Sequence, residues 1–219
     1  MKTKTQVLIV DDHPVVWEGL ALRINRQPDL AVCGEARSPA AALKLIATAK
    51  PDIAVIDLML RDGGGLDLIR DIATRHPGLP TLVFSGYDER LYAPRALRAG
   101  ARGYVMKQEA TEKVVEAIRY VLDGHICVSK RMQSRFLDGL AKGKTPPGDS
   151  PLEHFTDREL EVYRLLGAGL QTRNIAAKLH LSISTIETYC ERIKLRLSLE
   201  SRSDLVRHAA IWANTQESC

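Results

Sequence analysis

The amino-acid sequence predicts two domains: an α/β domain with a doubly wound, five-stranded parallel sheet, and a small all-α domain of four helices. From residue 6 to residue 123, short apolar runs alternate with segments of helical periodicity. From residue 155 to residue 213, four helical patterns follow one another without a strand-like run. Alternating strand and helix patterns with short connections are typical of parallel sheets that helices cover on both faces.

The strands of the first domain are predicted from apolar runs near residues 6–10, 30–36, 52–57, 80–85 and 102–106. The helices are predicted at 13–27, 39–49, 65–75, 89–98 and 111–123. Ser38 and Pro39 have the order of an N-cap and a first helical residue, which supports the start of the second helix. Gly100 and Gly124 stand where the last two helices should end.

We expect the first domain to span residues 1–123, a linker with a possible helix to span 124–151, and the helical domain to span 152–219. The stretch 143–151 is too rich in proline and glycine for a regular element. Thr156 and Glu159 have the spacing of a capping box. Helices near 172–180 and 183–197, joined by a tight turn, predict a helix-turn-helix, and a last helix is expected near 203–212.

Composition narrows the class of protein. The chain has 219 residues, 45% of them hydrophobic, which is enough for two ordinary domains, and its net charge is +4. The basic excess is larger in residues 124–219 than in 1–123, which is weak evidence for a polyanionic partner of the second domain. No apolar run approaches the roughly 20 residues that span a bilayer, and no signal segment is recognisable. We therefore expect a soluble cytoplasmic protein.

The cysteines do not point to metal or disulfide chemistry. Their spacing fits neither a zinc site nor a compact disulfide framework, so free thiols in a reducing compartment are expected. They are Cys33, Cys127, Cys190 and Cys219.

Polar side chains follow the predicted strands at their carboxyl ends. Asp11 and Asp12 follow the first strand, Asp57 ends the central one, and Ser85 and Lys107 end or follow the last two. In an open parallel sheet these ends meet at one edge, where ligands bind. A single aspartate at a strand end is more often a turn or cap residue, so the prediction of a site depends on all five occurring in order.

These five side chains predict phosphoryl chemistry. The three carboxylates would repel one another without a divalent cation, and Mg²⁺ is the expected ion because it is bound through carboxylates, waters and phosphate oxygens. Asp57 is then a candidate nucleophile toward a phosphoryl group. Lys107 and the metal would neutralise charge on the transferred oxygens, and Ser85 could donate a hydrogen bond.

At these positions residues 1–123 resemble the receiver domain of two-component response regulators, and residues 152–213 resemble the LuxR-type helix-turn-helix. Together they are similar to the NarL/FixJ class nearly end to end. In the first domain the matching residues are Asp11-Asp12, Asp57, Gly65-Leu66-Asp67-Leu68, Ser85, Ala99-Gly100-Ala101-Arg102-Gly103-Tyr104 and Lys107. In the second they are Phe155 to Val162, Gly169, Asn174-Ile175-Ala176, Leu179, Leu181-Ser182, Ser184-Thr185-Ile186, Lys194 and Leu197.

The resemblance implies a flavodoxin-like receiver in which Asp11, Asp12 and Asp57 bind Mg²⁺ and Asp57 is the phosphoacceptor. It also implies that Lys107 contacts the phosphoryl group, and that Ser85 and Tyr104 form a switch. Phosphorylation is then expected to pull Ser85 toward the phosphate and to let Tyr104 turn inward, which alters the face around 88–106.

Two residues depart from the receiver pattern. Arg61 stands where many receivers have proline, which is expected to loosen the loop after Asp57. Gln108 follows Lys107 where many receivers have proline, so a cis peptide bond is not expected there.

The predicted helix near 183–197 has an apolar stripe and an opposite polar face. The stripe contains Ile186, Tyr189, Cys190, Ile193 and Leu197. The other face, which we call the reading face, contains Ser184, Glu187, Thr188, Glu191 and Arg192. Candidates for contacts with the DNA backbone are Arg173, Lys178, Arg192, Lys194 and Arg202, although most charged helix residues are solvated surface.

Glu187 and Tyr189 depart from the family, which commonly has lysine or another groove-compatible residue at position 187 and histidine at position 189. The carboxylates of Glu187 and Glu191 are unfavourable near phosphates, yet glutamate can accept a hydrogen bond from cytosine N4 in the major groove. Alternatively, Glu187 caps the start of the helix or pairs with a lysine or arginine.

The resemblance implies a transcriptional regulator that accepts a phosphoryl group from a sensor histidine kinase and then binds double-stranded DNA as a homodimer. The last helix offers Leu205, Val206, Ala209 and Ile211 as a dimer contact, or these residues belong to the domain's own core. One alternative is a protein-interaction regulator whose helical domain no longer reads DNA specifically, as Glu187 and Glu191 suggest. An enzyme such as a phosphatase using Asp57 is the less favoured alternative, because the implied transfers concern only the protein's own phosphorylation.

Overall fold

The computed structural model describes residues 4–60, 63–109, 111–141 and 150–217. The chain divides into two compact units, Met1–Asp138 and Gly139–Cys219, and each is described by itself. Arg61, Cys219 and most of the proline- and glycine-rich stretch lie outside the described residues. Among the described helices, none combines the length and the apolar character that a membrane span requires.

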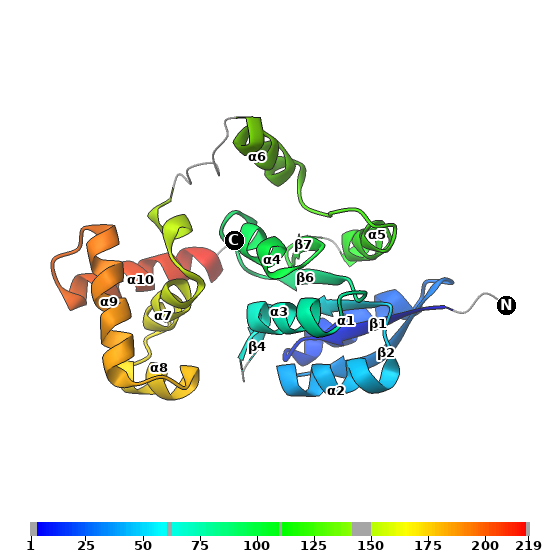
Figure 1. The fold of residues 1–219 in the computed structure, drawn as a ribbon, viewed down its shortest axis with the longest axis horizontal. Helices are drawn as coiled ribbons and strands as arrows, with labels where there is room; N and C mark the ends of the chain where they lie inside the picture. The colour runs from blue at the N-terminus through cyan, green and yellow to red at the C-terminus, as the bar shows by residue number, and fades with distance from the viewer. Residues whose placement is uncertain (1–3, 61–62, 110, 142–149, 218–219) are drawn as a thin grey trace. The chain divides into compact units, whose positions relative to one another are not determined.

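The first unit contains the predicted parallel sheet, and the α/β prediction is confirmed (Figure 1). Within the described residues its strand order is β2-β1-β3-β6-β7. The strands are β1 Thr5–Val10, β2 Leu30–Ala36, β3 Ile53–Ile56, β6 Thr81–Ser85 and β7 Gly103–Met106. Both faces of a parallel sheet are covered, which explains why these strands read as continuous apolar runs rather than as alternating patterns.

Helices cover the two faces of this sheet. They are α1 Pro14–Asn25, α2 Pro39–Ala49, α3 Gly65–Arg75, α4 Glu89–Ala99 and α5 Thr111–Leu122. The α1 and α5 helices pack together on one face, where Ile24 and Ile118 meet Val7, Ile9 and Val55 in the core. The other face carries α2, α3 and α4 in that order. A further helix, α6 Lys130–Ala141, lies within the predicted linker.

The predicted helix signals have the expected geometry. The side chain of Ser38 accepts a hydrogen bond from the backbone N–H of Ala41, with Pro39 in the first turn. Gly100 ends α4 with φ of 112°, a left-handed conformation that favours glycine. A short antiparallel pair after Asp57, formed by β4 Met59–Leu60 and β5 Gly63–Gly64, was not predicted, because two-residue strands have no periodicity to detect.

In the second unit, residues 150–217 are helical, as predicted. The elements are a 3₁₀ helix η1 Pro151–His154, α7 Asp157–Gly167, α8 Thr172–Leu179, α9 Ile183–Leu197 and α10 Arg202–Glu217. Thr156 and Glu159 form the predicted capping box, in which each side chain accepts the other's backbone N–H. The α10 helix runs beyond the predicted end near residue 212, because no glycine or proline stops it.

The apolar side of α10 belongs mainly to the core of its own unit. Leu205 and Ala209 are fully buried, whereas Val206 and Ile211 are exposed. A Cβ atom at Gly167 would lie 2.5 Å from the carbonyl oxygen of Ala209, so glycine at the end of α7 allows α10 to pack closely. The alternative that Leu205 and Ala209 serve the domain core is therefore correct.

The close packing of α3 against the end of β3 can be tested at Gly65, because a glycine there lets α3 begin directly against β3. A Cβ atom at Gly65 would lie 2.4 Å from the carbonyl oxygen of Asp57 and 2.6 Å from Cα of Leu58. We expect Gly65→Ala to lower the free energy of unfolding of the first unit by about 1–3 kcal/mol through overpacking. The readout is urea unfolding followed by Trp17 fluorescence in a Trp212→Phe background.

Gly19 is the matched control. It lies exposed in α1, and a Cβ atom there would meet nothing within 4 Å. Gly19→Ala should raise the same free energy by about 0.5–1 kcal/mol, because alanine loses less backbone entropy in a helix. A shift in the same direction for both variants would contradict the steric role of Gly65.

Candidate functional site

The strand register brings the predicted acidic residues together at the carboxyl edge of the sheet. Val10 of β1 pairs with Ile56 of β3, so the residues that follow these strands lie side by side. Asp11, Asp12 and Asp57 are all buried, with exposed fractions of 3%, 8% and 2%. One carboxylate oxygen from each of them, together with a ring nitrogen of His13, lies within 4.8 Å of the others.

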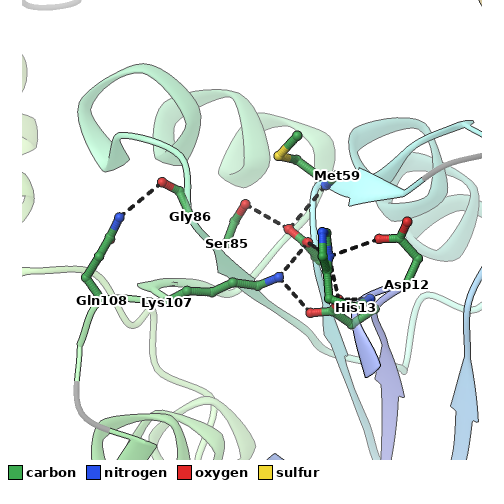
Figure 2. Close-up of polar contacts among 9 residues, drawn as sticks. Asp12, His13, Met59, Ser85, Gly86, Lys107 and Gln108 are labelled. Carbon is green, nitrogen blue, oxygen red and sulfur yellow. Dashed lines mark hydrogen bonds and ion pairs between the residues drawn. The ribbon is translucent and has the colours of Figure 1, made fainter. Parts of the chain in front are cut away.

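Both carboxylate oxygens of Asp57 have close partners, and these partners, Ser85, Met59 and Lys107, are labelled in Figure 2. Its Oδ1 accepts hydrogen bonds from the Ser85 hydroxyl at 2.9 Å and from the backbone N–H of Met59 at 3.2 Å. Its Oδ2 lies 2.7 Å from Nζ of Lys107. Burial raises the pKa of the Asp57 carboxyl, while the ammonium of Lys107 acts in the opposite direction.

The ammonium group of Lys107 contacts the carboxylates of both Asp57 and Asp11. Its Nζ also lies 2.7 Å from Oδ2 of Asp11, so it sits between the first and third strands of the site. Burial by itself would lower the pKa of Lys107, but the carboxylates of Asp57 and Asp11 outweigh it and the pKa is raised. The acidic cluster therefore keeps a negative excess beside this ammonium, and its buried oxygen donors fit a hard divalent cation.

The predicted switch residues already lie inward. Ser85 and Tyr104 are both buried, and the Tyr104 hydroxyl donates to the carbonyl oxygen of Tyr87 at 2.9 Å. The ring of Tyr87 stacks on that of Tyr92 with centroids 4.4 Å apart. Tyr104 is thus already inward in this structure, with its hydroxyl bonded to the Tyr87 carbonyl, and a rearrangement of Ser85 and Tyr104 on phosphorylation stays a prediction.

Gln108 has its own partner in the loop after β6. Its side-chain amide donates to the carbonyl oxygen of Gly86 at 3.4 Å. The described residues contain no cis peptide bond.

His13 is a pocket residue that the sequence analysis missed. Its Nδ1 lies 3.2 Å from Oδ1 of Asp11, 3.2 Å from Oδ1 of Asp12 and 3.9 Å from Oδ2 of Asp57 (Figure 2). The available signal was the order Asp-Asp-His-Pro: Pro14 fixes the helix start, so the preceding residue is held beside the acidic pair. A histidine before a helix is ordinarily read as a cap or surface residue.

In the second unit, α9 has the predicted two faces. Ile186, Cys190 and Ile193 are buried, while Tyr189 and Leu197 are half-buried. The whole reading face, Ser184, Glu187, Thr188, Glu191 and Arg192, is exposed. The α8 and α9 helices, separated by a short turn, therefore present α9 as a recognition helix would require.

Ser182 caps α9, and Glu187 does not. The Ser182 hydroxyl accepts a hydrogen bond from the backbone N–H of Thr185 at 3.0 Å and lies 2.8 Å from the Ser184 hydroxyl. The Thr188 hydroxyl donates to the carbonyl oxygen of Ser184 at 2.9 Å. The hydroxyls at the start of α9 are thus engaged with the helix itself.

The two glutamates of the reading face differ in their interaction partners. Glu191 lies 3.0 Å from Nζ of Lys194, whose side chain is only 17% exposed. For Glu187, no hydrogen bond or ion pair is found among residues 150–217. The alternative in which Glu187 pairs with a lysine or arginine therefore finds no support among residues 150–217, and Glu191 is the glutamate of this face that has a lysine partner.

The remaining candidates for backbone contacts are dispersed. Arg173 and Lys178 are exposed on α8, and Arg192 is exposed on α9. Arg202 is exposed and donates to the hydroxyl of Thr172. Lys194 is mostly covered and paired with Glu191, which makes it a weaker candidate than the four arginine and lysine side chains that are exposed.

Two families match this chain, one in each unit. The family described as "Response regulator receiver domain" matches residues 7–119, which include the whole acidic cluster. The family described as "Bacterial regulatory proteins, luxR family" matches residues 153–209, which include α8 and α9.

Relatives match the chain along most of its length. It is 35% identical to the "DNA-binding transcriptional activator DevR/DosR" of Mycobacterium tuberculosis over 95% of this chain and 93% of that protein. It is 30% identical to the "Oxygen regulatory protein NreC" of Staphylococcus haemolyticus over 93% of this chain and 96% of that protein.

One solved structure is similar to most of the chain. RcsB from Salmonella enterica serovar Typhimurium, bound to promoter rprA in the presence of phosphomimetic BeF3-, is 25% identical with a TM-score of 0.71. The match covers 95% of this chain and 99% of that one. With both domain families matched in order and a 35% identical relative along nearly the whole chain, this protein belongs to the response regulators of the NarL/FixJ class, in which a receiver domain precedes a luxR-family DNA-binding domain.

Proposed function

We propose that this protein is a phosphorylation-dependent DNA-binding regulator of transcription, in which Asp57 accepts a phosphoryl group from a sensor histidine kinase. The observation that carries the proposal is the buried Asp57 carboxylate, with the Lys107 ammonium at one oxygen and the Ser85 hydroxyl at the other. The relatives support it, since one is named a DNA-binding transcriptional activator and RcsB was solved on a promoter with a phosphomimetic.

In the transfer, an oxygen of Asp57 forms a bond to phosphorus while the bond from phosphorus to the kinase histidine nitrogen breaks, which leaves an acyl phosphate. Lys107 is placed to neutralise charge on the transferred oxygens. Asp11, Asp12 and Asp57 are the residues that would hold Mg²⁺. When bound, Mg²⁺ would supply the positive charge that this acidic cluster needs to accept a further anion.

The switch is proposed to act through Ser85 and the loop behind it. A phosphoryl group on Asp57 offers Ser85 a new acceptor, and Ser85 is followed directly by Gly86 and Tyr87. Tyr104 holds the carbonyl of Tyr87, whose ring stacks on Tyr92 of α4. A displacement of Ser85 would therefore reach α4 and β7, and the response is a shift between two packed arrangements.

The proposed output is binding of double-stranded DNA by α9 in the cytoplasm, as a homodimer, rather than turnover of a separate substrate. Enrichment of genomic fragments by the phosphorylated protein tests this output. A recurring site in the bound fragments is the expected result. Fragments without any shared site would favour a protein-interaction regulator in place of a sequence-specific one.

We expect Asp57 to be the single phosphorylation site. Treatment with acetyl phosphate and Mg²⁺ should add one phosphoryl group to the intact protein, measured by mass spectrometry, and Asp57→Asn should abolish the addition. Asp52→Asn is the matched control, because Asp52 lies just before the same strand at the opposite edge and accepts the backbone N–H of Gln6. Full labelling of Asp57→Asn would remove the assignment.

Phosphorylation should favour a symmetric dimer, because two helix-turn-helix units on neighbouring half-sites require a two-fold arrangement. Sedimentation of the phosphorylated protein on DNA with two half-sites should show the dimer, and Asp57→Asn should not respond. Ile211→Asp should weaken the dimer if the exposed part of α10 contributes to the contact. A phosphorylated protein that stays monomeric on such DNA would contradict the prediction.

Glu187 should read a base, whereas Glu191 should not. Glu187→Gln or Glu187→Lys should cost about 1–3 kcal/mol of discrimination at one base pair if a contact with cytosine N4 is lost. Glu187→Lys should also steepen the salt dependence by about one unit if a phosphate contact forms. Binding is measured on the enriched site and on random DNA at several salt concentrations.

The control for this experiment is Glu191→Gln on the same face. It should free Lys194 and strengthen binding to random DNA without changing the preferred base. If Glu187→Lys leaves base preference and salt dependence unchanged, Glu187 is a surface residue and the reading contacts lie on Ser184, Thr188 and Arg192.

A further inference from the structure

We propose that Glu89 is a positioning residue that fastens the start of α6 to the start of α4, and that phosphorylation of Asp57 opens this contact. The inference rests on the proposed function, because it concerns where a movement of Ser85 leads. It goes further in naming the bond that breaks, which joins the Glu89 carboxylate to the backbone N–H of Ser129. It also names the element that is released, α6, which is the last helix before the luxR-family domain in the chain.

The segment between α5 and α6 runs along the outer edge of β7. The backbone N–H of Cys127 donates to the carbonyl oxygen of Arg102 at 2.9 Å, and the Cys127 carbonyl accepts the N–H of Tyr104 at 2.8 Å. These bonds form a parallel bridge between Gly103 and Cys127. A Cβ atom at Gly103 would lie 2.9 Å from the Cys127 carbonyl oxygen, so the glycine permits this close approach. We call residues 127–129 the strap.

The strap ends at Ser129, which caps α6. The Ser129 hydroxyl accepts a hydrogen bond from the backbone N–H of Met132 at 3.2 Å. The N–H of Ser129 itself donates to Oε1 of Glu89 at 2.8 Å. The carboxylate therefore lies at the start of α6, where the helix dipole favours a negative charge. Val128 and Met132 are buried, so apolar packing lies on either side of this bond along the chain.

Glu89 is linked to the acidic pocket through the loop after β6. It is the first residue of α4 and stands four residues after Ser85. Tyr87 lies between them, and its carbonyl oxygen accepts the Tyr104 hydroxyl at 2.9 Å. Tyr104 is thus bound to this loop through its hydroxyl and to the strap through its N–H. A movement of Ser85 toward a phosphoryl group on Asp57 would shift the start of α4 relative to β7.

The bond from Ser129 to Glu89 is the part of this linkage that breaks most easily. Cys127 is held to β7 and its preceding residue by main-chain hydrogen bonds. The Glu89 contact depends instead on a half-buried side chain. A hydrogen bond at 2.8 Å is lost when its atoms separate by about 1 Å. The strap would therefore stay on β7 when α4 moves, and the start of α6 would lose its acceptor.

The test is amide hydrogen exchange of the full-length protein, followed by NMR for individual residues, with and without acetyl phosphate and Mg²⁺. We expect the Ser129 N–H to exchange about 10–100-fold faster after phosphorylation, the factor that a hydrogen bond to a charged acceptor contributes. The N–H groups of Cys127 and Tyr104 should stay protected. Equal acceleration at Cys127 and Ser129 would overturn the proposal, because the strap as a whole would then have left β7.

Substitutions at Glu89 separate this contact from a general loosening. Glu89→Ala should accelerate Ser129 exchange in the unphosphorylated protein by the same factor, with little further change on phosphorylation. Glu89→Gln should keep the protection, because the amide oxygen is still an acceptor. An unchanged Ser129 rate in Glu89→Ala would contradict the proposal.

Glu112→Ala is the matched control. Glu112 also stands in the first turn of its helix, and it pairs with Arg23 rather than with the strap. This variant should leave the Ser129 rate, and the response of that rate to phosphorylation, as they are in the unsubstituted protein. Acceleration as large as in Glu89→Ala would show that the effect is not specific to Glu89, and would overturn its role.

Two further outcomes separate this proposal from the proposed function. If mass spectrometry shows the phosphoryl group on Asp57 and the Ser129 rate is unchanged, the role of Glu89 alone is overturned. If acetyl phosphate adds no phosphoryl group, both are overturned, because nothing would then open the contact.

Discussion

The rest of the receiver depends on how the negative charge of the buried Asp57 carboxylate is compensated by nearby donors and by a cation. A charged group away from water is costly unless it is paired and hydrogen-bonded, and here Lys107, Ser85 and the Met59 N–H provide that balance. Ser85 ends β6, Lys107 follows β7, and Met59 begins the short strand β4 after β3. The parallel sheet order, with β6 beside β3 and β7 beside β6, brings Ser85 and Lys107 within reach of Asp57.

The same contacts explain how a change at Asp57 could affect the ends of β6 and β7. Ser85 is both a partner of Asp57 and the last residue of β6, and Lys107 follows β7. The backbone N–H of Lys107 donates to the carbonyl of Ser85 at 2.8 Å, which couples the two strand ends directly. A new acceptor on Asp57 would compete for both side chains at once. Interfaces of this kind respond by changing between packed arrangements rather than by deforming gradually.

Much of this could be predicted from residues, because the signals are strong where burial is complete. Val7 to Val10 and Ile53 to Ile56 are fully covered on both faces, so their apolar runs mark strands, and the residues after them fall at one edge. The orientation of His13, the inward position of Tyr104 and the Glu191 pair with Lys194 could not be predicted. Each depends on a side-chain rotamer and on neighbours from other elements, which spacing along the chain does not specify.

The reading face sets a limit on how the second domain can bind DNA. Lys194 is paired with Glu191, and Arg202 donates to the hydroxyl of Thr172, so both cations already have partners within the domain. Sequence-independent electrostatic binding of DNA grows with the number of phosphates that the protein neutralises. One copy of this domain should therefore bind random DNA weakly. Specific binding must then draw on base contacts and on a second copy. A receiver that controlled dimerisation would therefore also control the affinity for DNA, so a phosphoryl group on Asp57 could govern DNA binding without a change in α9 itself.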